Sequence, residues 1–155
     1  MLPSTESSYS SHTTKGPCSF DSAEIPPLLV LIEMLHAMEG VYSRLVRGLG
    51  LAYRCWITNL TESGLINLRI LQSSNITNAF EQIKRATHQL AVGEQSFDAF
   101  ALDGAKSSVI FDIADCENTR PIAASQSFIS KVLKQSQYRK TDLFKAVQVQ
   151  LGEEI

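Results

Sequence analysis

Apolar and polar positions along this chain follow two different periods. Between residues 28 and 46, apolar side chains recur at steps of three and four, which predicts one core-facing helix that ends near Gly48. Asp21 or Ser22 is expected to cap this helix, and the two prolines at 26 and 27 suit its first turn. Its predicted inward residues are Leu28, Leu31, Ile32, Leu35, Met38, Tyr42, Leu45 and Val46.

A strand pattern follows this helix. Residues 51–60 are rich in strand-favouring types, and residues 65–71 alternate so that Ile66, Leu68 and Ile70 share one face. The intervening Thr-Glu-Ser-Gly is a turn sequence, so the two segments predict a β-hairpin. A further short stretch, Glu6 to Ser11, could pair as an edge strand.

The helical period returns after Asn75, which offers a capping oxygen, and predicts a second helix that stops at Gly93. Its inward residues are Ile76, Ala79, Phe80, Ile83, Ala86 and Leu90. A third helix is expected from Ser96, with Phe97, Phe100, Ala101, Ala105, Val109 and Ile113 inward. A fourth is expected from near Thr119, with Pro121 in its first turn and with Ile122, Ser125, Phe128, Ile129 and Val132 inward. Thr141 is expected to cap a short fifth helix.

This order of elements predicts an α+β fold in which helices pack on one face of a mostly antiparallel sheet. A hairpin cannot shield its own apolar face, so the sheet is expected to be incomplete and to need strands from elsewhere. Residues 21–155 are expected to form a single domain, and residues 1–20 an N-terminal segment that carries the possible edge strand.

Composition excludes several classes of function. Of 155 residues, 44% are hydrophobic and 19% charged, with a formal net charge of -2, so no broad basic surface for nucleic acid or an anionic membrane is expected. The apolar run from Ile25 to Leu35 is too short and too interrupted to span a bilayer. Three cysteines without Cys-x-x-Cys spacing favour a reduced, intracellular setting, cytoplasmic or mitochondrial.

Two patterns that suggest chemistry have simpler interpretations. His36 and Glu39 could share a metal, but a zinc site needs a further ligand, and Gly40 stands where a second histidine would be required. We therefore expect a solvent-facing pair and no metal site in this chain. Cys55 is adjacent to Arg54, which could lower its pKa, yet no base is evident, so we expect a half-buried strand cysteine.

The segment Arg47-Gly-Leu-Gly-Leu-Ala-Tyr53 places a cation, a glycine-rich bend and a phenol where a helix gives way to a strand. Such a junction can direct a bidentate donor and a hydroxyl donor at one point, as in sites that bind a carbonyl or stabilise an oxyanion. The same residues are also explained without function, because arginines commonly end helices and tyrosines are common in strands.

Several segments, taken in order, resemble the pitrilysin family of zinc metallopeptidases, and most closely its presequence-protease-like branch. The resemblance runs from about Glu6 to Ile155, and its most specific part ends at Tyr53. The matching segments are Glu6–Tyr9, Lys15–Pro17, Leu45–Tyr53, Glu62–Leu65, Gln72–Asn75, Ala105–Ser108 and Ala123–Phe128.

The resemblance implies one domain of a mitochondrial-processing-peptidase-like metallohydrolase, in the C-terminal, non-catalytic half of an insulysin-like enzyme. In that family an arginine and a tyrosine bind the substrate backbone near a zinc ion carried by another domain, and Arg47 and Tyr53 match those positions. The zinc motif is absent here, so the chain is expected to be inactive alone. The implied partners are a peptide substrate and a catalytic half that carries zinc, in the same longer chain or a separate one.

Arg54 stands where the family often has glycine, which puts the shape and charge of the chamber wall in doubt. Two alternatives remain open at this stage. The first is a non-enzymatic scaffold subunit of the same fold, in which Arg47 and Tyr53 would be relics. The second is an independent α+β domain that binds a small molecule in a pocket remote from Arg47.

Overall fold

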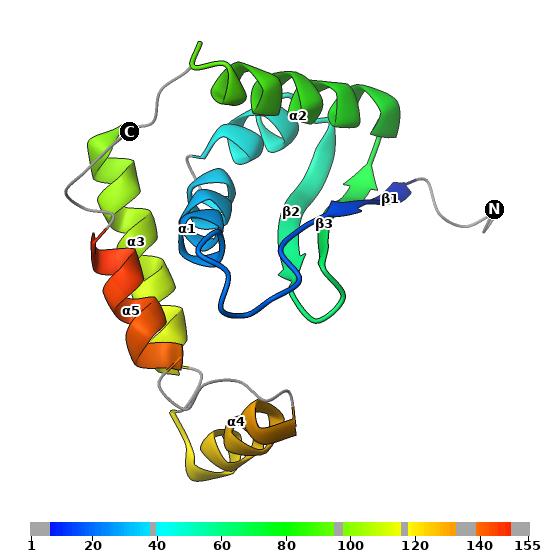
Figure 1. The fold of residues 1–155 in the computed structure, drawn as a ribbon. Coiled ribbons are helices and arrows are strands. Elements are labelled where there is room, and N and C mark those ends of the chain that lie inside the picture. The colour runs from blue at the N-terminus through cyan, green and yellow to red at the C-terminus, as the bar shows by residue number, and fades with distance from the viewer. Residues whose placement is uncertain (1–6, 38–39, 95–97, 116–117, 133–138, 150–155) are drawn as a thin grey trace.

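A three-stranded antiparallel sheet and two groups of helices make up the fold (Figure 1). The computed structural model of the chain describes residues 7–37, 40–94, 98–115, 118–132 and 139–149. Its elements are β1 (Ser8–Lys15), α1 (Ile25–His36), the π-helix η1 (Ser43–Arg47), β2 (Ala52–Leu60), β3 (Leu65–Ser73), α2 (Ile76–Ala91), α3 (Ala99–Asp115), α4 (Arg120–Val132) and α5 (Arg139–Val149). The predicted α+β class with a predicted hairpin at 51–71 is confirmed.

The strand order is β1-β3-β2, so β3 is central and the other two strands form the edges among the described residues. β2 pairs with β3 from Ala52 opposite Ser73 to Leu60 opposite Leu65. β1 pairs with β3 from Ser8 opposite Ser73 to Lys15 opposite Leu65, with one register shift near its start. All pairs are antiparallel.

The two faces of the sheet have different environments. On one face, Ile70 is fully buried and packs with Ala79 and Ile83 of α2, as the alternation of β3 predicted. On the opposite face, the side-chain amide of Asn67 donates hydrogen bonds to Ser11 Oγ at 2.8 Å and Thr13 Oγ1 at 3.1 Å. These cross-strand bonds hold a β1 that has almost no apolar residues.

A second core lies among α1, α3 and α5, which run side by side in Figure 1. Val30 and Met34 of α1 pack there against Ala105 and Val109 of α3, and with Val147 of α5. At the end of α1, Leu35 belongs instead to the sheet core. Helix α1 therefore links the two cores, and its C-terminal end lies against the sheet.

The loop between η1 and β2 is fixed by the backbone of Leu51. The Leu51 N–H donates to Val46 O at 2.9 Å, while its carbonyl accepts from Ser73 Oγ at 2.7 Å and Ser74 N at 3.1 Å. Gly50 makes the bend possible with a φ of 64°, a conformation that costs a residue with a Cβ. This loop joins the two segments that carry Arg47 and Tyr53.

The single helix predicted to run from a cap at Asp21 or Ser22 to Gly48 is wrong. Helix α1 begins at Ile25, with Glu24 rather than Asp21 or Ser22 at its N-cap and with Pro26 and Pro27 in its first turn as predicted. It ends at His36, after which Ala37 has an extended ψ of 146°. The chain then turns and forms η1, and Leu31, expected inward, is exposed. Leu35 at the end of α1 and Tyr42 and Val46 on the far side of the break all pack in the sheet core, so the pattern of apolar residues does not reveal the break. Met38 and Glu39 lie outside the described residues.

The edge strand predicted at 6–11 lies further along, at Ser8–Lys15, where its backbone pairs with β3. Its residues do not alternate between apolar and polar types, so the sequence pattern did not reveal its bounds. Glu6 is outside the described residues.

In α3, Phe100 and Ala101 were expected inward, but both are exposed, Phe100 by 86%. That helix carries apolar residues nearly all round, so periodicity could not fix its phase. It begins at Ala99, and the expected start at Ser96 and the inward Phe97 lie outside the described residues.

The inward face predicted for α4 is not buried. No described residue of this helix is buried, and its apolar face is open to solvent in the described structure, with Phe128 exposed by 69%. Periodicity shows that a helix has an apolar face, but it does not show what covers that face.

The predictions for the helix ends have mixed outcomes. Pro121 lies in the first turn of α4 as predicted. Asn75 caps α2 as predicted, because its side chain accepts a hydrogen bond from Asn78 N at 3.1 Å. Helix α5 begins at Arg139, so Thr141 lies within the helix rather than at its cap.

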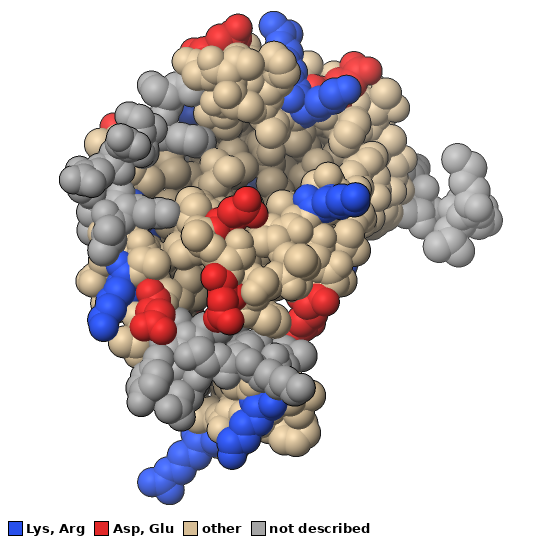
Figure 2. All heavy atoms as spheres, viewed as in Figure 1, with Lys and Arg blue, Asp and Glu red and all other residues tan. Residues whose placement is uncertain are grey.

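Charge is distributed without a dominant sign on the face shown in Figure 2, where basic and acidic side chains are interspersed. Within the described ranges, no helix is long and apolar enough to cross a membrane.

Replacing Gly50 with alanine is expected to destabilise the fold by about 1 kcal/mol, because alanine is strained at this positive φ. A Cβ at Gly50 would meet nothing within 4 Å, so the cost is conformational rather than steric. Gly50→Asn is the matched control, since asparagine tolerates this conformation better. Urea unfolding would measure both variants, and equal stability of wild type and Gly50→Ala would contradict this account.

Candidate functional site

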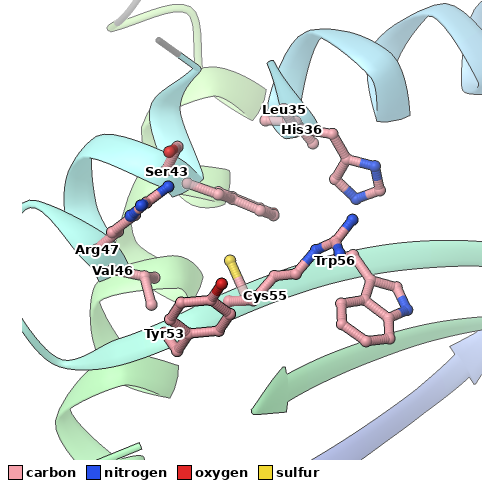
Figure 3. A pocket seen from close by; sticks show the side chains of 10 residues that line it. Leu35, His36, Ser43, Val46, Arg47, Tyr53, Cys55 and Trp56 are labelled. Carbon is pink, nitrogen blue, oxygen red and sulfur yellow. The ribbon is translucent and has the colours of Figure 1, made fainter. Parts of the chain in front are cut away.

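A cavity of about 290 Å³ lies beside the edge of β2, where the end of α1 and the π-helix η1 meet that strand (Figure 3). Its lining comes from three short segments of the chain. They contribute Leu35 and His36, then Tyr42, Ser43, Val46 and Arg47, and finally Tyr53, Arg54, Cys55 and Trp56. The cavity is therefore built around the loop that Leu51 fixes.

The structure brings together the two residues singled out in the sequence. Arg47 ends η1, Tyr53 follows the first residue of β2, and both line the cavity. The guanidinium carbon of Arg47 lies 5.9 Å from the centroid of the Tyr53 ring, at the outer range of a cation–π contact. Tyr53 is 64% exposed, so its hydroxyl is accessible to a ligand. The pair can present two kinds of hydrogen-bond donor at one place.

A second arginine–aromatic pair was missed by the sequence analysis. The guanidinium carbon of Arg54 lies 5.0 Å from the centroid of the Trp56 ring, a cation–π geometry. Residues two apart on a strand point to the same face, so the Arg-x-Trp spacing was a usable signal. Arg54 therefore has a defined position beside the cavity.

His36 has a structural role that the sequence did not suggest. It is half-buried, and its Nε2 accepts a hydrogen bond from the backbone N–H of Ile57 at 2.6 Å. Burial, and secondarily the charge of Arg54, lowers the pKa of His36 below its usual 6.5. The expected solvent-facing position is therefore wrong for His36, while Glu39 lies outside the described residues.

Cys55 is a half-buried strand cysteine, as expected. Burial raises its pKa to about 11, so the neighbouring Arg54 does not activate it. A thiol with this pKa is almost wholly protonated near neutral pH and is a poor nucleophile.

The described residues do not fit a zinc ion. They contain no group of three His, Cys, Asp or Glu side chains that could hold a metal. The Nε2 lone pair of His36 is also engaged by Ile57.

The folded-state pKa of His36 predicts how stability depends on pH. Because that pKa is lowered, the unfolded chain binds more protons between it and about pH 6.5. This contribution to stability is full above about pH 6.5 and is lost as the pH falls through the folded pKa. His36→Gln keeps a possible acceptor for Ile57 but does not titrate, so it should weaken this pH dependence.

Urea unfolding of wild type and His36→Gln at about pH 7.5 and about pH 5.5 would measure the difference. The comparison matters because burial and Asp112 raise the pKa of Glu33, which has the opposite effect on stability as the pH falls. Subtracting the variant from the wild type removes that contribution. An identical pH dependence in both proteins would contradict the role assigned to His36.

The raised pKa of Cys55 predicts slow alkylation in the native protein. At about pH 8 roughly one thiol in a thousand would be ionised, whereas Cys18 is exposed. Iodoacetamide labelling followed by peptide mass spectrometry should modify Cys18 and should modify Cys55 only after unfolding in urea. Equal labelling of Cys18 and Cys55 in the native protein would show that Cys55 is more accessible or more acidic than the structure indicates.

Two comparisons with known sequences have different outcomes. No protein-family model matches the chain. Uncharacterized protein YOL098C of Saccharomyces cerevisiae is 30% identical over 117 residues, which cover 74% of this chain and 11% of that protein. Uncharacterized protein C3H1.02c of Schizosaccharomyces pombe is 25% identical over 127 residues, which cover 82% of this chain and 12% of that protein. The chain thus spans about a tenth of the length of these relatives.

Two solved structures have a similar fold. One is described as the "Inactive Peptidase Domain of a Putative Zinc Protease" from Bordetella parapertussis, with a TM-score of 0.74, 12% sequence identity, and coverage of 90% of this chain and 77% of that one. The other is a "putative zinc protease" from Bordetella pertussis Tohama I, with a TM-score of 0.73, 10% identity, and coverage of 90% and 78%. At these identities the likeness concerns the fold, and the chain has a fold like that of a zinc-protease peptidase domain.

Proposed function

We propose that this chain is a substrate-binding, chamber-forming, non-catalytic domain of a pitrilysin-type zinc metalloendopeptidase. In this role Arg47 and Tyr53 hold the backbone of a peptide near a zinc ion that another domain carries. The single observation that supports it best is the placement of these two donors at one cavity, on a fold like that of an inactive peptidase domain.

The chemistry of the pair suits a peptide backbone. Peptide carbonyl oxygens are acceptors, and both a guanidinium and a phenol donate hydrogen bonds to acceptors. Bonds from a charged donor are stronger than neutral ones, so Arg47 would contribute more of the affinity than Tyr53. A carbonyl that becomes an oxyanion during hydrolysis would be held more tightly still. The same two residues could therefore both bind the substrate and stabilise its transition state.

Trp56 provides a direct readout of peptide binding. It is the single tryptophan of the chain and it lines the cavity, so a ligand there should change its fluorescence. Arg47→Ala is expected to weaken binding of an unstructured peptide about tenfold or more, through loss of a charge-assisted hydrogen bond. Tyr53→Phe should weaken it by a smaller factor.

Matched controls are available for both variants. Arg44→Ala removes the same charge from the same helix η1, but Arg44 does not line the cavity. Tyr9→Phe removes the hydroxyl of an exposed tyrosine on β1, and it serves as the control for Tyr53→Phe. If Arg44→Ala and Arg47→Ala weaken binding equally, the effect is one of overall charge and the proposed role of Arg47 is wrong.

Combination with a zinc-carrying catalytic half would test the catalytic part of the proposal. Loss of one oxyanion-type donor commonly costs about 10²–10³ in rate, so Arg47→Ala and Tyr53→Phe should each reduce peptide turnover by about that factor. Unchanged turnover in both variants would reject the assignment. Recovery of the chain in a stable assembly without peptidase activity would favour the scaffold alternative instead.

A further inference from the structure

The open edge of β2 has a defined set of free backbone groups. Gly16 N donates a hydrogen bond to Gly64 O, just beyond the paired residues of β1 and β3. Because bonding groups alternate along a strand, the backbone N–H and C=O groups of the even-numbered residues of β3 point toward β1. The backbone groups of the odd-numbered residues of β3 therefore point toward β2. They pair with the backbone groups of the even-numbered residues of β2. The N–H and C=O groups of Tyr53, Cys55 and Ile57 consequently point away from the sheet.

His36 confirms this orientation of the backbone groups and limits the length of the free edge of β2. Its hydrogen bond from Ile57 N requires that the Ile57 N–H point outward, as the register predicts. The end of α1 thereby occupies the edge at Ile57. Among the described residues no strand pairs with β2 on the side away from β3, so Tyr53 and Cys55 form a short pairing segment that opens beside the cavity.

The cavity beside this segment carries positive charge without compensation. Its ten lining residues include Arg47 and Arg54 and no aspartate or glutamate. Within the described part of the chain, neither guanidinium forms an ion pair. His36 adds a neutral donor, because its Nε2 accepts from Ile57 and its proton is therefore on Nδ1.

Both arginines lie near aromatic rings. The guanidinium of Arg54 lies over Trp56 at 5.0 Å, and that of Arg47 lies near Tyr53 at 5.9 Å. A guanidinium whose side chain is already ordered loses less entropy on binding. Its charge and its fork of N–H donors match the two oxygens of a carboxylate, which favours a carboxylate over neutral acceptors. The volume of about 290 Å³ is large enough for one acidic side chain or a chain terminus.

We infer that this site binds an extended peptide that carries a carboxylate, with its backbone paired to Tyr53 and Cys55 and its carboxylate in the cavity with Arg54. Arg54 is then a specificity-determining residue that Trp56 positions. The inference rests on the proposed peptide-binding role. It adds that the peptide carries a carboxylate and that its backbone lies along the edge of β2 and ends before Ile57.

Three short synthetic peptides of strand-favouring sequence would test the carboxylate. All have an acetylated N-terminus; one has a central glutamate and an amidated C-terminus, one replaces that glutamate with glutamine, and one has glutamine with a free C-terminal carboxylate. Affinity is measured by anisotropy with a dye-labelled peptide, which does not depend on Trp56. At least one carboxylate peptide should bind about tenfold more tightly than the neutral peptide, and comparison of the two shows which carboxylate is used.

Arg54→Gln should abolish this preference and bring the affinities within about twofold of one another. Arg69→Gln is the matched control, because Arg69 lies opposite Trp56 on β3, is exposed and does not line the cavity. It should leave the preference unchanged. A preference that survives in Arg54→Gln, or equal binding of all three peptides to the wild type, would overturn the inference.

N-methylation along the best-binding peptide would test the strand pairing. A methyl group on an amide that faces Tyr53 or Cys55 removes a donor and should weaken binding about tenfold, whereas methylation of the adjacent amides should not. Absence of this two-residue alternation would reject pairing along the edge.

The same measurements separate the inference from the proposed function. If the neutral peptide binds through Arg47 and Tyr53 and a carboxylate adds no affinity, the proposed function stands and only the inference is rejected. Absence of binding by every peptide would reject both.

Discussion

The arrangement of the site depends on the backbone of Leu51. Its N–H is bonded to η1 and its carbonyl to Ser73 and Ser74 at the end of β3, so this one peptide segment ties the π-helix to the sheet. Ser73 is 1% exposed, and its hydroxyl bond to Leu51 is shielded from competing water. Because Arg47 and Tyr53 lie on either side of this anchor, their separation is set by the fold and not by the flexibility of two long side chains.

The same region concentrates groups that do not serve stability in an obvious way. Two arginines lie beside one cavity without an acidic partner among the described residues, and an exposed tyrosine faces the same space. We propose that the counter-charge of these two arginines comes from a ligand.

The sequence predicted those features that depend on local chemistry. The hairpin, the Asn75 cap and the place of Pro121 follow from residue types at short range, and so does the junction that carries Arg47 and Tyr53. Features that depend on a distant partner were not predictable. The contact of His36 with Ile57 joins residues 21 positions apart, and the break after α1 leaves the apolar period undisturbed. The open apolar face of α4 likewise requires knowledge of what packs against it.

The two edges of the sheet differ in a way that bears on which one a peptide would use. The outer edge of β1 is polar and exposed along nearly its whole length, and none of its residues lines the cavity beside β2. Main-chain hydrogen bonds alone give a pairing strand little selectivity, since water competes for every one of them. At β2 the free segment is short because His36 closes it at Ile57, but it opens beside a cavity that contains charged donors. Affinity there would come from a few backbone bonds combined with one anchored side chain, and this combination selects both the position and the register of a bound peptide.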